Sequence, residues 1–202
     1  MEKDIRKGYH LVWEEQFDGE SLNMDDWNVE THEPGWVNSE LQEYVDSTDN
    51  IYIEDGNLVL KPIETINQDG TKSYTSGRVN TQNKHDFKYG LFEARLKVPK
   101  GQGFLPAFWM MPTCEEHYGQ WPRCGEIDIM EVMGQATDTF YGTIHFGDPH
   151  KQSQGTYVLK EGSFAGSSSS DALASSSPNL CIRTISKAFI SLPQAGSVAW
   201  WE

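Results

Sequence analysis

Apolar and polar residues alternate along short stretches of this chain, as in β-strands with one buried and one solvated face. In the segment 92–98 (FEARLKV) every second residue is apolar, and Glu93, Arg95 and Lys97 fall on the opposite face. The segment 140–146 (FYGTIHF) alternates in the same way. We therefore predict a half-buried strand over each of the two segments.

A β-hairpin is the clearest local prediction. Residues 51–60 (IYIEDGNLVL) contain two strand-like runs joined by Asp55-Gly56, and Asp-Gly is a preferred composition of a type I′ turn. A second Asp-Gly pair stands at Asp69-Gly70, and no segment keeps a helical period over three turns. Many short strands separated by Gly, Pro, Asn and Asp indicate an all-β fold, either a sandwich or a jelly roll.

The pattern changes close to residue 162. Between positions 163 and 177, eight of fifteen residues are Ser, and a stretch of this composition resists packing into a core. We predict one folded β domain over residues 1–162 and a linker-like segment over 163–178. Residues 179–202 receive no assigned element.

Composition and charge exclude several classes of protein. The 202 residues include 16 basic and 30 acidic side chains, which gives a formal net charge of −14. Nucleic-acid binders and proteins that adsorb to anionic membranes need basic surfaces, so neither class fits. No apolar stretch is long enough to span a membrane, and residues 1–10 lack the apolar core of a signal peptide. We expect a monomer that binds neither nucleic acid nor membrane.

The aromatic content points to a different partner. Seven Trp, eight Tyr and nine Phe make up 12% of the chain, too many for a disordered acidic protein. Aromatic rings stack on pyranose faces, while carboxylates and amides hydrogen-bond to hydroxyl groups. A neutral sugar is therefore the partner that the composition favours.

The three cysteines leave two alternatives open. Cys114 and Cys124 are ten residues apart and could close a small disulfide loop, or both could be free thiols, and Cys181 would stay unpaired in either case. Neither the Cys spacing nor the His spacing matches a zinc site, so we predict no metal ligand.

The segment 125–132 (GEIDIMEV) is the most informative in the chain. In a strand, Glu126 and Asp128 lie on one face, whereas Met130 takes the next position on that face and Glu131 follows it. A β-bulge inserts one extra residue, and here it would return Glu131 to the face of the other two acids. The pattern predicts three carboxyl groups on one strip of strand.

Two carboxyl groups on one strip are the machinery of glycoside hydrolysis. Two Glu side chains leaning toward each other across the bulge could approach the ~5–5.5 Å separation of a retaining pair. The charges of Asp128 and the nucleophile would then raise the pKa of the acid. The simpler alternative is a solvated acidic strand face. Trp109 and Trp121, which both precede the motif, favour the sugar-binding interpretation.

This segment resembles the active-site strand of glycoside hydrolase family 16. With the extra residue Met130, the motif resembles the EIDIxE motif of the laminarinase (endo-β-1,3-glucanase) branch of that family. Further similarities extend over most of residues 9–160, at LVWEEQFDG (11–19), NSELQEY (38–44), YTSGR (74–78), YGLFEAR (89–95), GQGFLPAFWM (101–110) and GTIHFG (142–147).

The resemblance implies a concanavalin-like β-jelly roll, a sandwich of two antiparallel sheets, whose concave sheet carries a glucan cleft. It implies endo-hydrolysis of β-1,3-glucosidic bonds in laminarin-like or mixed-linkage β-glucan, with retention of configuration. Glu126 would be the nucleophile, Glu131 the general acid/base and Asp128 the assisting carboxylate. The residues expected to line the subsites are Trp109, Trp121, Asn38, Arg78 and His145. For Arg78 a structural ion pair, and for His145 an ordinary strand position, are the alternatives.

The chain departs from the family pattern in two places. The resemblance stops near Phe164-Ala165, and the remainder resembles a frameshifted or truncated ending, so the sandwich is expected to be incomplete at its C-terminus. Gln16 stands where the family often has an acidic residue associated with a structural calcium, which weakens the case for calcium; no other cofactor is expected. Members of the family are usually secreted. Two alternative functions follow: a non-catalytic β-glucan-binding protein, or an inactive truncated fragment.

Overall fold

The computed structural model describes residues 8–88 and 90–165, together with the backbone of 180–191. These residues form strands and one short helix, in the chain order β1 (Tyr9–Glu15), β2 (Asn28–Val29), β3 (Gln42–Tyr44), β4 (Ile51–Glu54), β5 (Asn57–Leu60), β6 (Ile63–Ile66), β7 (Lys72–Ser76), β8 (Val79–Asn80), β9 (Ala94–Lys97), β10 (Ala107–Met110), α1 (Glu115–Tyr118), β11 (Glu126–Glu131), β12 (Thr139–Phe146), β13 (Lys151–Val158) and β14 (Leu180–Ser191). The all-β prediction is confirmed.

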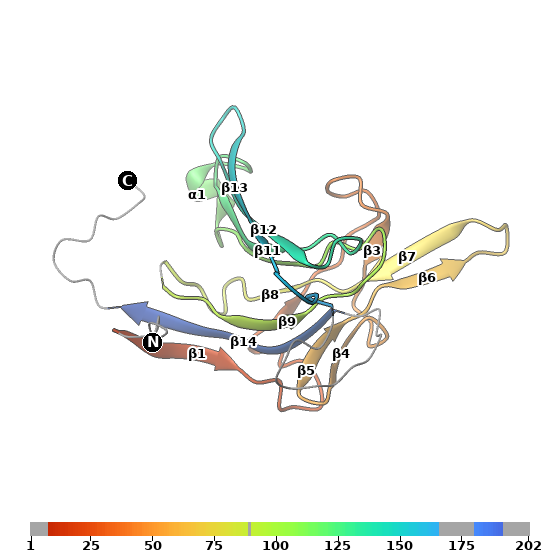
Figure 1. The fold of residues 1–202 in the computed structure, drawn as a ribbon, viewed down its shortest axis with the longest axis horizontal. Helices are drawn as coiled ribbons and strands as arrows, with labels where there is room; N and C mark the ends of the chain where they lie inside the picture. The colour runs from red at the N-terminus through yellow and green to blue at the C-terminus, as the bar shows by residue number, and fades with distance from the viewer. Residues whose placement is uncertain (1–7, 89, 166–179, 192–202) are drawn as a thin grey trace.

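Two larger antiparallel sheets carry the fold. One runs in the order β1-β14-β5-β4, with β9 also paired to β14, and the other in the order β10-β11-β12-β13. Figure 1 shows β11 and β12 lying over β9 and β14, while the β6–β7 hairpin extends to one side. Two small sheets, β2-β8 and β3-β7-β6, complete the set, and in the latter β3 pairs with β7 in parallel, which the sequence did not predict.

The hydrophobic core lies between the two larger sheets. Its buried members are Phe17, Trp27, Ile51, Leu58, Val98 and Val132. Phe108 and Met130 from the β10–β13 sheet, and Leu96 from β9, pack against them. Burial of apolar side chains from both sheets is what holds the two layers together.

The predicted local elements form with small shifts in their bounds. The hairpin pairs β4 with β5, and Asp55 and Gly56 have φ angles of 52° and 68°, as a type I′ turn requires. The strand predicted over 140–146 is β12, and the one predicted over 92–98 is the shorter β9.

The C-terminal part of the chain is described only in its backbone. Strand β14 lies in the region that received no assigned element, and it pairs antiparallel with β1, β5 and β9. Most of the Ser-rich segment predicted as a linker falls in 166–179, outside the described residues. The division into a domain, a linker and a tail stays a prediction.

Two other predictions concern single features. Cys114 is exposed and Cys124 is buried, and both are free thiols, so the disulfide alternative is not realised; Cys181 lies where only the backbone is described. Among the described residues, no helix has the length and hydropathy to cross a membrane.

Candidate active site

A bulge in β11 gives the acidic motif its geometry. Asp128 pairs with Thr143 of β12 and Glu131 pairs with Tyr141, so three steps along β11 correspond to two along β12. The register with β10 shifts at the same place, because Phe108 pairs with Met130. The side chain of Met130 packs against the core. The bulge predicted from the sequence is confirmed, and its reason is that Met130 fills a core position between two acids.

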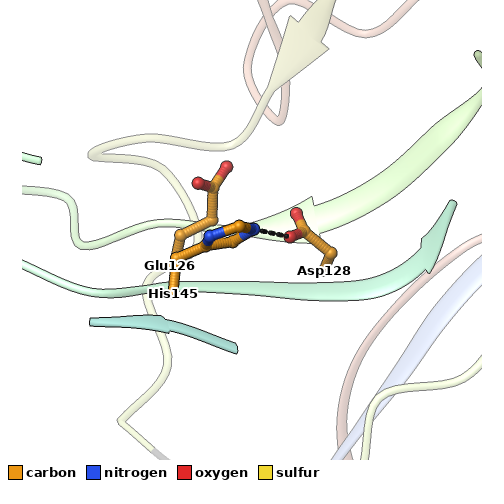
Figure 2. A group of neighbouring side chains, drawn as sticks. All are labelled: Glu126, Asp128 and His145. Carbon is orange, nitrogen blue, oxygen red and sulfur yellow. Dashed lines mark ion pairs between the residues drawn. The ribbon is translucent and has the colours of Figure 1, made fainter. Parts of the chain in front are cut away.

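Glu126, Asp128 and His145 gather on one side of the sheet. Glu126 and His145 are direct partners across β11 and β12. Nε2 of His145 lies 3.1 Å from Oδ2 of Asp128, and Figure 2 shows these side chains projecting together from the two strands. The indole N–H of Trp121 donates a 2.7 Å hydrogen bond to Oε2 of Glu126. A strand partner and a preceding loop therefore both hold the motif.

The protonation of the motif differs from one acid to the next. Asp128 is only 7% exposed, and its burial, together with the charges of Glu126 and Glu131, raises its pKa to about 6 despite the opposing effect of His145. Burial is also the main cause of the raised pKa of Glu131, to which Glu126 contributes. The expectation that Asp128 would raise the pKa of the acid was therefore incomplete, since Asp128 itself holds a proton to unusually high pH.

The alternative of a fully solvated acidic face does not hold at Asp128. Burial alternates along the strand, but the apolar residues are on the more exposed face, because Ile127 and Ile144 are 42% and 44% exposed while Asp128 and Thr143 are buried. Ile127 and Ile144 are partners across β11 and β12, so the exposed apolar pair lies on the opposite face from Asp128. The polar face is thus the better covered one at this level of the sheet.

Trp109 links the acidic motif to a second cluster. It pairs with Asp128 across β10 and β11. The Arg78 guanidinium lies 4.5 Å from the Trp109 ring centre and 5.2 Å from that of Trp36. Nε of Arg78 also lies 2.9 Å from Oε2 of Glu30. Arg78 thus makes the structural ion pair that the sequence left as an alternative, and its contact with a sugar stays a prediction.

The surroundings of Glu30 favour its ion pair with Arg78. Burial alone would raise its pKa, but the charge of Arg78 and hydrogen bonds from Asn80, His32 and Arg78 hold the pKa of the carboxyl below its usual range. Its side chain therefore stays ionised and keeps the guanidinium in place against the rings of Trp36 and Trp109.

The sequence did not single out Trp36 as a functional residue. It is 53% exposed and stacks on His32 with ring centres 3.5 Å apart and planes 5° from parallel. Asn38 follows it in the same loop, exposed and in the left-handed region with φ 53°. The available signal was that Trp36 stands two residues before the matched NSELQEY segment. Proximity of Asn38 to the acids stays a prediction.

One group of the described residues has the atoms to hold a cation, and it belongs to the acidic motif. Ligand atoms of Glu126, Asp128 and His145 lie within 4.8 Å of one another. The indole hydrogen bond and the Asp128–His145 pair already partner them, and their predicted catalytic role stays a prediction. Around Gln16, the described residues gather no group of three acidic, His or Cys side chains. The amide of Gln16 donates to Glu14. A structural calcium stays untested.

The raised pKa of Asp128 predicts a pH-dependent stability. The folded protein keeps the Asp128 proton that the unfolded chain releases above its ordinary value of 3.8. The contribution of Asp128 to the free energy of unfolding therefore falls as the pH rises from about 4 to about 6, by on the order of 3 kcal/mol. Urea unfolding of wild type and Asp128→Asn measures this, because the variant has no such proton to lose and should gain on the wild type as the pH rises from about 4 to about 6, with a constant difference above that.

Asp69→Asn is the matched control for this measurement. Hydrogen bonds from Thr71 lower the pKa of Asp69, so its effect on stability has the opposite sign and its loss cannot imitate the loss of Asp128. A constant difference between wild type and Asp128→Asn from acid to neutral pH would contradict the prediction.

Comparisons with known proteins agree on one family. The model of the glycosyl hydrolases family 16 matches residues 37–167. The chain is 40% identical over 171 residues to glucan endo-1,3-beta-glucosidase A1 of Niallia circulans, covering 77% of this chain and 25% of that protein. It is 46% identical over 141 residues to glucan endo-1,3-beta-glucosidase of Cryptopygus antarcticus, covering 68% and 51%. The chain thus spans a quarter to a half of the length of these relatives.

A solved structure extends the similarity to the fold. The catalytic domain of an endo-1,3-beta-glucanase (laminarinase) from Thermotoga petrophila superimposes with a TM-score of 0.68 at 31% identity, over 89% of this chain and 87% of that one. The predicted jelly-roll sandwich is confirmed by this likeness. The sequence match, the bulged acidic strand and the shared fold lead to one statement of identity: this chain belongs to the glycosyl hydrolases of family 16.

Proposed function

We propose that the protein cleaves internal β-1,3-glucosidic bonds of β-glucans, either laminarin-like or mixed-linkage, by a retaining double displacement. The observation that carries the proposal is the bulged strand β11, which keeps Glu126, Asp128 and Glu131 together beside Trp121. The names of the Niallia circulans and Cryptopygus antarcticus relatives, and of the Thermotoga petrophila laminarinase, support the choice of β-1,3-glucan.

The different environments of the acids suit different roles. Glu126 is the nucleophile, and the Trp121 indole N–H directs one carboxylate oxygen while leaving the other to attack the anomeric carbon. Glu131 is the general acid and then the general base, because its raised pKa keeps a proton available for the leaving oxygen. Asp128 sits between them and adjusts the local charge.

The aromatic residues supply the contacts with sugar. Trp121 is 46% exposed and can stack on a pyranose ring beside the nucleophile. Trp109 stands next to Asp128, and with Trp36 it extends this surface along the Arg78 cluster. Asn38 would bind sugar hydroxyl groups from its exposed loop.

The chief alternative is a non-catalytic β-glucan-binding protein on the same fold. Binding needs the aromatic surface and has no use for a proton donor with a raised pKa. The presence of both Glu126 and Glu131, with the environment that raises the pKa of Glu131, favours catalysis. An inactive fragment is the other alternative, and a cooperative thermal transition would count against it.

Hydrolysis assays test the proposal directly. Laminarin, mixed-linkage β-glucan and a β-1,4-glucan are incubated separately with the protein, and reducing ends and viscosity are followed. We expect reducing ends and an early fall in viscosity with β-1,3-containing substrates only, and proton NMR should show the β-anomer first. Binding of laminarin without any release of reducing ends would instead support the glucan-binding alternative.

A further inference from the structure

His150 extends the acidic motif into a chain of three side chains. It is an exposed residue in the turn between β12 and β13. Its Nε2 lies 2.9 Å from Nδ1 of His145, and Nε2 of His145 lies 3.1 Å from Oδ2 of Asp128. The two imidazole rings stack with centres 5.2 Å apart. Asp128 is therefore connected through His145 to an imidazole at the surface.

The Trp121 ring ties this chain to the nucleophile. Its centre lies 5.0 Å from the His150 ring and 6.0 Å from the His145 ring, while its indole N–H bonds Glu126. The side chains that hold the nucleophile and those that contact Asp128 therefore form one packed group.

The chain accepts two arrangements of its protons. When Asp128 is protonated, its O–H donates to Nε2 of His145, and Nδ1–H of His145 donates to Nε2 of His150. When Asp128 is ionised, Nε2–H of His145 donates to the carboxylate, and Nε2–H of His150 donates to Nδ1 of His145. His145 must change tautomer between them, and it can do so only if its second partner exchanges the roles of donor and acceptor. An imidazole does this, while a Lys or a carboxylate does not.

We infer that His150 is a positioning residue, which lets His145 follow Asp128 from one protonation state to the other while Glu126 alternates between carboxylate and glycosyl ester. The inference rests on the proposed function. In passing from the first arrangement to the second, one proton moves from Oδ2 of Asp128 to Nε2 of His145, and one from Nδ1 of His145 to Nε2 of His150. No proton enters or leaves, and the positive charge forms on an exposed ring, where its solvation is least disturbed.

The charges around Asp128 supply the driving force. The charges that act on it come from Glu126 and Glu131 on its own strand and from His145 on β12. Formation of the ester removes the charge of Glu126 and with it part of the repulsion that keeps Asp128 protonated. The pKa of Asp128, about 6 while Glu126 is charged, then falls toward its ordinary value, and the proton passes to His145.

The first experiment needs no catalysis. Glu126→Gln imitates the neutral ester, and ¹⁵N NMR near pH 6 reports which nitrogens of His145 and His150 carry protons. We expect His145 to shift toward the Nε2–H form in Glu126→Gln relative to wild type, with increased protonation of His150. Glu116→Gln, the same change on helix α1, should leave both rings unchanged. Identical His145 spectra in wild type and Glu126→Gln would overturn the inference.

The second experiment separates positioning from folding. His150→Ala should lower kcat on laminarin roughly 10-fold, a fraction of what a direct proton donor contributes, and leave KM within about twofold. Added imidazole should restore much of the rate, because the vacated site is exposed. His117→Ala is the matched control, at an exposed histidine of α1 whose ring packs on Tyr118. It should leave kcat unchanged, and added imidazole should have no effect on its rate. An unchanged kcat in His150→Ala would also overturn the inference.

The outcomes also separate the two proposals. Absence of hydrolysis by wild-type protein contradicts the proposed function, while the NMR comparison still decides how His150 and His145 respond to Glu126. Normal hydrolysis with an unresponsive His145 removes the inference alone.

Discussion

Glu126→Gln is expected to lower the rate of laminarin hydrolysis by on the order of 10⁴-fold or more, because an amide cannot form the glycosyl ester on which the double displacement depends. The amide can still accept the Trp121 hydrogen bond through its carbonyl oxygen, so the local geometry should be retained. Initial rates of reducing-end release, with laminarin binding followed by calorimetry, measure the two effects separately.

Glu116→Gln is the matched control for this loss. It makes the same chemical change at an exposed position of α1, so it tests whether the loss belongs to Glu126 alone. Binding of laminarin by Glu126→Gln should stay within a few-fold of wild type. Equal hydrolysis by wild type and Glu126→Gln would refute the assignment of the nucleophile.

Glu131→Gln is expected to produce a loss that depends on the leaving group. With laminarin, whose leaving oxygen must be protonated, the rate should fall by about 10²–10⁴-fold. With an aryl β-glucoside of low leaving-group pKa, formation of the ester needs no proton, so this step should be much less affected. Burst kinetics measure the rate of ester formation, since the ester should accumulate when Glu131 no longer activates water.

The two variants are distinguished by this pattern. Glu126→Gln should fail with both substrates, whereas Glu131→Gln should fail with laminarin and give a burst with the aryl glucoside. If Glu131→Gln slowed ester formation from the aryl glucoside as much as it slows laminarin hydrolysis, that would contradict its role as acid/base. A structural role for this side chain would then be favoured.

Local patterns predicted the features that depend on neighbouring residues. The Asp55-Gly56 turn follows from φ preferences, and the bulge follows from the displacement of Glu131 by one position. Both require only the stereochemistry of a strand and its turn. The parallel pairing of β3 with β7 depends on contacts between distant segments, and no local pattern encodes it.

The acids of the candidate site belong to one local motif, whereas their surroundings come from distant segments. His150 could not be found from the sequence, because its contact with His145 arises only when the β12–β13 hairpin closes. The place of Arg78 likewise depends on the approach of Trp36 and Trp109 from two separate segments. Alternation also failed to predict the burial of Thr143 and the exposure of Ile144, since packing against other segments decides which face is covered.

The indole hydrogen bond to Glu126 also gives the protein an optical reporter. Tryptophan emission responds to charge and hydrogen bonding at the indole nitrogen, and that nitrogen in Trp121 is bonded directly to Glu126, the proposed nucleophile. In the proposed mechanism, conversion of the carboxylate to an ester would alter this contact in every turnover, and a sugar stacked on the exposed ring would alter it again. Stopped-flow fluorescence could therefore follow single catalytic cycles on unlabelled glucan, with Trp121→Phe to identify the source of the light.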